Sequence, residues 1–191
     1  MTIPDQHRRE IAVMAARFIA DEGLISFREA RHRAATALHA SQRDLPDDQE
    51  VLAALREHLE LFEPDHAAAV EDLRLAALQV MDVLAPFKPQ VTGCAAEGLA
   101  PEGALIELLL WADSEKDVEM TLMKANIRYE VSPTRDPRSV IIHCHDSEPA
   151  VDLRILAPGH SLAGVMPMGR NQPGIRLSRE ALAALVEGAD A

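Results

Sequence analysis

Residues 104–112 read Ala-Leu-Ile-Glu-Leu-Leu-Leu-Trp-Ala, an apolar run that one carboxylate, Glu107, interrupts. A short, nearly continuous apolar run is typical of a strand that is covered on both faces of a sheet. A carboxylate within such a strand must face solvent, a cleft or a partner, because burying it unpaired is costly. The run therefore predicts a strand that presents Glu107 at a ligand-facing surface. If the strand lies at a sheet edge, exposure to solvent alone explains a carboxylate at this position.

The sequence on either side of this run predicts further strands. Short apolar segments bounded by Gly, Pro and Asp occur at 90–95, 127–131, 140–145 and 151–156. The last two are joined by a turn-forming segment at 146–149, which predicts a hairpin. A helix is expected from Ser114 to Lys124, and a second one between Ser178 and Gly188.

The sequence before residue 90 predicts helices instead. Apolar residues recur there at intervals of three and four, and cap residues separate the segments. Ser26 is expected to cap one helix, and Pro46 to occupy the first turn of another that runs to about residue 62. The predicted fold class is α+β (α/β). An N-terminal helical region, residues 1–85, precedes a small mixed β-sheet flanked by helices, residues 86–191.

Composition narrows the classes of partner. The chain has 191 residues, with 19 basic and 31 acidic side chains, and a formal net charge of −12. Its acidic residues are spread over both halves, so nucleic acid is not an expected partner. No apolar run is long enough to cross a membrane, and two cysteines are too few for a disulfide scaffold, which together predict a cytoplasmic protein.

A motif precedes the Glu107 strand. The segment from Gly93 to Gly98 reads Gly-Cys-Ala-Ala-Glu-Gly, and Leu105-Ile-Glu107 follows after a short loop. This pattern resembles the signature of the nucleotidyltransferase superfamily with the DNA polymerase β-type fold, Gly-Ser-x-Ala-x-Gly, a loop and Ser-Asp-Ile-Asp-Leu. The whole chain also resembles a group of proteobacterial proteins that carry a nucleotidyltransferase-like domain behind an N-terminal helical region.

The resemblance implies a nucleotide-binding site at Gly93, Cys94 and Gly98, and Mg²⁺ as the cofactor. Glu107 falls on the second metal-binding aspartate, and Asp152 resembles the third carboxylate of the superfamily. Leu105 stands where the first aspartate is expected, and an alkyl side chain cannot bind a hard cation. The resulting prediction is a nucleotidyltransferase-like protein that is catalytically impaired or inactive, and at most binds a nucleoside triphosphate or phosphate.

Two other hypotheses stay open at this point. Glu107 and Asp152, helped by Glu97 or Glu102, could support slow Mg²⁺-dependent transfer of a nucleotide to a hydroxyl group on a protein or small molecule. Alternatively, the chain is a non-catalytic module that binds a protein partner or a second copy of itself.

Three other segments also carry groups that could bind a ligand. His143 and His145 are expected on one face of a strand, with Cys144 on the other. With Asp152 they could hold a metal or a phosphate, although cross-strand polar pairing explains them equally well. The basic residues of 28–33 are expected to form a solvated helix face that pairs with nearby acids, and Arg170 lies in a long Gly/Pro-rich loop.

Overall fold

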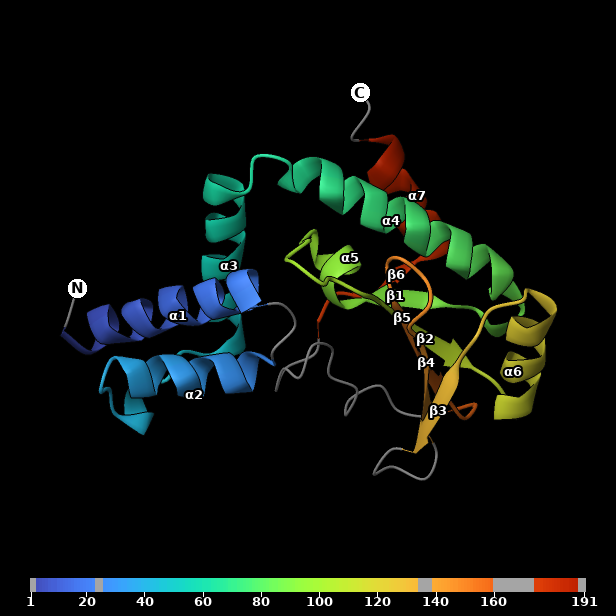
Figure 1. The fold of residues 1–191 in the computed structure, drawn as a ribbon, viewed down its shortest axis with the longest axis horizontal. Helices are drawn as coiled ribbons and strands as arrows, with labels where there is room; N and C mark the ends of the chain where they lie inside the picture. Colours follow the sequence, from blue (N-terminus) through green and yellow to red (C-terminus); the bar gives the residue numbers. More distant parts are fainter. Residues whose placement is uncertain (1–2, 23–25, 134–138, 160–173, 189–191) are drawn as a thin grey trace. The chain divides into compact units, whose positions relative to one another are not determined.

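The computed structural model describes residues 3–22, 26–133, 139–159 and 174–188 (Figure 1). Within these ranges the chain forms two compact units. The first comprises the described residues up to 68 together with 99–104, and the second comprises the others. The predicted division into regions 1–85 and 86–191 stays a prediction.

The first unit is helical. Its elements are α1 (Ile3–Glu22), α2 (Phe27–Ala37), the 3₁₀ turn η1 (Gln42–Asp44) and α3 (Asp48–Phe62). Their core is made of fully buried aliphatic and aromatic side chains, among them Ile11, Ile19, Phe27, Leu55 and Leu59. Leu99, from the loop at 99–104, is buried in the same cluster, so this loop belongs to the helical unit.

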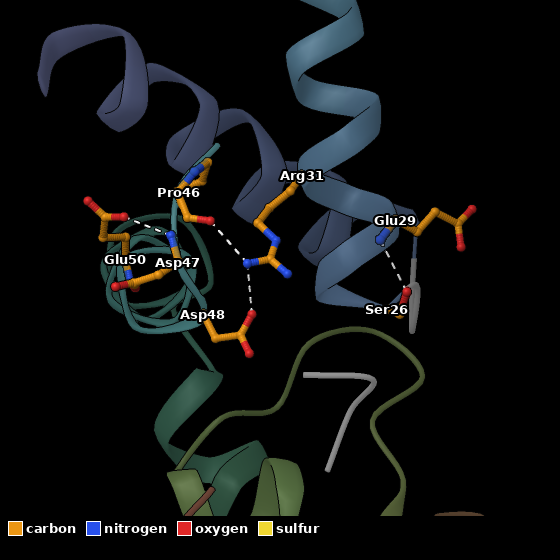
Figure 2. Close-up of polar contacts among 7 residues, drawn as sticks. All are labelled: Ser26, Glu29, Arg31, Pro46, Asp47, Asp48 and Glu50. Atoms are coloured by element: carbon orange, nitrogen blue, oxygen red, sulfur yellow. Dashed lines mark hydrogen bonds and ion pairs between the residues drawn. The ribbon is translucent and has the colours of Figure 1, made fainter. Parts of the chain in front are cut away.

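Local capping signals explain where these helices begin. The Ser26 hydroxyl accepts a hydrogen bond from the Glu29 amide at 3.2 Å, as predicted. At α3 a reciprocal pair forms, because the Asp47 carboxylate accepts from the Glu50 amide and the Glu50 carboxylate accepts from the Asp47 amide (Figure 2). The prediction that Pro46 lies inside this helix is wrong, since it precedes the Asp47 cap and is not helical.

The basic segment at 28–33 does not form one solvated face. Arg31 is 8% exposed, and its Nη1 lies 3.0 Å from the Pro46 carbonyl oxygen and 2.9 Å from Asp48 Oδ1 (Figure 2). Arg33 pairs with Glu22 at 2.7 Å, as expected of a surface cation. Arg31 therefore joins α2 to the start of α3, and only its neighbours remain at the surface.

The second unit is a six-stranded mixed sheet flanked by helices, which confirms the predicted α+β class. The strands are β1 (Gln90–Thr92), β2 (Ile106–Trp111), β3 (Glu130–Pro133), β4 (Ser139–Cys144), β5 (Val151–Leu156) and β6 (Leu177–Ser178). Their order across the sheet is β3-β4-β5-β2-β1-β6. The pair β2 and β5 is parallel, and every other neighbouring pair is antiparallel.

Helices of the second unit supply apolar side chains to its core. They are α4 (His66–Val83), α5 (Gly93–Glu97), α6 (Glu115–Lys124) and α7 (Arg179–Glu187), with the 3₁₀ turn η2 at Ala85–Phe87. Buried side chains of α4, α6 and α7 include Leu73, Met81, Val118, Leu122 and Leu182. Only the part of α4 from residue 69 onward belongs to this unit.

Two sequence predictions about the sheet are wrong. The strand expected at 90–95 ends at Thr92, because Gly93 takes a left-handed backbone (φ +67°) and α5 begins there. The strand expected at 127–131 lies at Glu130–Pro133, since the chain first makes a left-handed turn at Asn126. The two-residue strand β6 was not predicted at all.

Candidate functional site

Five polar side chains lie in one row across a single face of the sheet. Thr92 on β1 pairs in register with Glu107 on β2, and Glu107 pairs with Asp152 on β5. Asp152 pairs in turn with His143 on β4, and His143 with Glu130 on β3. Because residues directly opposite each other on neighbouring strands point to the same face, the sheet brings Glu107, Asp152 and the histidine together.

The other face of the sheet is apolar. The adjacent register row is Val91, Leu108, Leu153, Ile142 and Val131; the first four side chains are at most 1% exposed, and Val131, on the edge strand β3, is 44% exposed. In the polar row Thr92 is buried, Glu107, Asp152 and His143 are partly exposed, and Glu130 is exposed. The Glu107 carboxylate therefore lies on a face that is partly exposed at this row and covered farther along the strands, where Leu109 and Leu156 are buried.

Glu107 lies against the first residue of α5. A Cβ atom added to Gly93 would stand 1.6 Å from Glu107 Oε2. Such close approach is open only to glycine, and the left-handed backbone of Gly93 favours glycine as well. The structure thus brings together Gly93 and Glu107, two residues that the sequence motif had placed in one site.

The remaining motif residues shape the short helix α5. Cys94 is buried, at 1% exposure, and Gly98 ends the helix in a left-handed conformation with its amide donating to the Cys94 carbonyl. Arg74, which sequence reasoning missed, lies beside this end. Its Nε donates to the Ala95 carbonyl at 3.1 Å, and burial lowers the pKa of its guanidinium. A cation among helix-terminal carbonyls stabilises them.

The Glu97 side chain hydrogen-bonds to the backbone just before β6. This carboxylate is 7% exposed, and its Oε1 accepts a hydrogen bond from the Ile175 amide at 3.1 Å. The Thr92 hydroxyl donates to the Ile175 carbonyl at 3.0 Å. Glu97 and Thr92 therefore clamp one residue between them. Glu102 lies in the other compact unit, and Leu105 is a partly buried residue directly before β2.

Asp152 is paired with His143. Its Oδ1 lies 2.7 Å from His143 Nδ1, with both side chains partly exposed. The ring of His145 stacks on that of His143, with centroids 5.3 Å apart and planes inclined by 8°. Cys144 points to the opposite, buried face, as the alternation predicted. Burial, together with the charge of Asp152, raises the pKa of the Cys144 thiol to about 11.

The histidines line a shallow pocket of about 220 Å³. Its other lining residues are Arg128, Tyr129, Glu130 and Asp146. Among the described residues, no three His, Cys, Asp or Glu side chains converge closely enough to hold a metal ion as they stand. The loop segment that contains Arg170 lies outside the described residues.

No family model, curated protein or solved structure matches this chain. The helices in the described ranges are also too short or too polar to cross a bilayer.

Proposed function

We propose that this chain is a nucleotidyltransferase-like protein that binds a nucleotide or phosphate and does not transfer it efficiently. The observation that carries the proposal is the pairing of Glu107 with Asp152, in register on neighbouring parallel strands, beside the Gly93 turn. The motif resemblance implies this placement for two metal-binding carboxylates next to a phosphate-binding turn. Both side chains are partly exposed.

The donor set does not fit a pair of Mg²⁺ ions. Two-metal sites hold their ions about 3.5–4 Å apart and need carboxylates that bridge or flank both of them. Mg²⁺ demands near-octahedral oxygen coordination, and Leu105 offers no oxygen from its side chain. Asp152 is already bonded to His143, and Glu107 lies against Gly93. These residues therefore do not make up a two-ion Mg²⁺ site.

The same geometry sets a condition on nucleotide binding. A triphosphate that approached the Gly93 turn would meet the Glu107 carboxylate, a group of like charge. Backbone amides can bind a phosphate, and a Mg²⁺ ion on the phosphates reduces their repulsion from a nearby carboxylate. We expect the nucleotide to bind as its Mg²⁺ complex and to bind much more weakly when a chelator removes the ion.

Turnover of a labelled nucleoside triphosphate tests the catalytic part of the proposal. We expect no Mg²⁺-dependent turnover by the natural chain and measurable turnover by Leu105→Asp. Leu105→Asn is the matched control, because it has the same shape as aspartate without the charge. Turnover by the natural chain that Glu107→Gln abolishes would overturn the proposal in favour of slow transfer to a hydroxyl acceptor.

Thermal unfolding with each nucleotide tests the binding part. A ligand at about 100 times its Kd should add about 2.7 kcal/mol to the stability of the folded state. A shift in Tm that Glu107→Lys alters and that depends on Mg²⁺ supports the proposal. No shift with any nucleotide would overturn it and favour the non-catalytic interaction module.

A further inference from the structure

The pair His143 and His145 carries chemistry that the proposed function does not use. The two imidazoles lie two residues apart at the end of β4, and both line the pocket of about 220 Å³. Their rings are nearly parallel, with centroids 5.3 Å apart. Imidazole nitrogens bind zinc at about 2.0–2.1 Å, so two nitrogens that share one ion are at most about 4.2 Å apart. The two rings are stacked and do not converge as they stand, so the exposed His145 side chain must rotate for one nitrogen of each ring to reach the same ion.

Asp152 prepares one of these rings for such a role. A carboxylate can only accept hydrogen bonds, so His143 Nδ1, 2.7 Å from Asp152 Oδ1, carries the proton. In the neutral ring Nε2 is then an unprotonated electron-pair donor. A carboxylate that orients a histidine in this way is the usual outer partner of a metal-binding imidazole.

The charges around the pocket favour a cation over an anion. Asp152 and Glu130 flank His143 in the polar row, and Glu130 lines the pocket itself. Arg128 is paired with Asp146 at 2.7 Å, so these two charges offset each other. The Tyr129 hydroxyl donates to Glu119 at 2.8 Å. The pocket groups that remain to face a ligand are the imidazoles of His143 and His145 and the carboxylate of Glu130.

From this geometry we propose that His143 and His145 bind one divalent cation of the zinc and nickel class, with Asp152 as the residue that positions His143. Imidazole suits these borderline metals, whereas Mg²⁺ and Ca²⁺ prefer oxygen. Structural zinc sites use four protein ligands, so two imidazoles leave positions for water and make the ion exchangeable. Among the described residues no third His, Cys, Asp or Glu side chain converges on the two imidazoles, so water would fill the remaining positions.

Calorimetric titration of the full chain with Zn²⁺ alone tests this site. We expect a site for one ion that either His143→Ala or His145→Ala weakens at least 10-fold. Asp152→Asn should weaken it about 10-fold or more, since loss of an outer partner has effects of this size. His32→Ala, which removes an exposed histidine from α2, is the matched control and should leave the affinity unchanged. Mg²⁺ should produce no heat that depends on either histidine.

Imidazole NMR signals provide a second readout that does not depend on global stability. Paramagnetic Ni²⁺ should broaden the ring signals of His143 and His145 before those of His32. Unchanged Zn²⁺ affinity in both alanine variants, or broadening that begins elsewhere, would overturn the proposal. Neither measurement involves a nucleotide. The proposed cation site is therefore tested independently of the proposed function.

Discussion

The Glu107 carboxylate occupies the space that a side chain on Gly93 would need, with Oε2 only 1.6 Å from the position of the absent Cβ. A strand residue and a turn residue are thus fitted to each other across the β1–β2 pair. The fit depends on glycine for two reasons, the close approach and the left-handed backbone at φ +67°.

Gly93→Ala should therefore destabilise the fold more than backbone strain alone predicts. A left-handed residue other than glycine costs about 1–2 kcal/mol. Gly159→Ala is the matched control, because Gly159 has φ +75° and nothing within 4 Å of its added Cβ. Chemical denaturation should show a larger loss for Gly93→Ala, and adding Glu107→Ala should recover the excess. Equal losses in the two glycine variants would show that Glu107 does not restrict this position.

The buried pair Arg31 and Asp48 gives a second stability prediction. Their side chains are 10% and 1% exposed, and Arg31 also bonds the Pro46 carbonyl. Arg31→Met keeps the apolar stem but leaves the Asp48 charge buried, which should cost about 3–5 kcal/mol. Arg17→Met removes an exposed ion pair with Asp21 and should cost about 0–1 kcal/mol. Denaturant titration of both variants checks the contrast, and similar losses would contradict it.

Ionisation of the Cys144 thiol is expected to lower the stability of the folded state at alkaline pH. Burial and the charge of Asp152 raise its pKa from an ordinary value of 9.0 to about 11. Between these values the unfolded chain releases the proton while the folded chain retains it, so the free energy of unfolding falls as pH rises. This contribution is fully present below about pH 9 and is lost as pH rises toward 11.

Comparison with Cys144→Ala isolates that effect. The variant should lose stability less steeply than the natural chain between pH 9 and 11, because it has no thiol to ionise on this strand. The measurement is the free energy of unfolding in denaturant at several pH values. Identical slopes for the two proteins would show that Cys144 ionises equally easily in the folded and unfolded states.

Sequence reasoning succeeded where the structural cause is local. At three helix starts a serine hydroxyl accepts a hydrogen bond from a backbone amide. These serines are Ser26, Ser114 and Ser178, and the residues that follow each of them predicted the helix start. The opposite directions of His143 and Cys144 were also predictable, because side chains alternate along any strand. It failed at Gly93, where a glycine compatible with a strand instead takes the left-handed conformation and starts α5.

By itself the sequence determined the α+β class, the helical first half and the short apolar strands, because periodicity, caps and turn residues act over a few neighbouring positions. Only the tertiary structure decided that Thr92, Glu107, Asp152, His143 and Glu130 form one row. It likewise decided that Arg31 is buried against Asp48. These arrangements depend on strand order and register and on helix packing, which long-range burial of apolar surface selects and which no local pattern encodes.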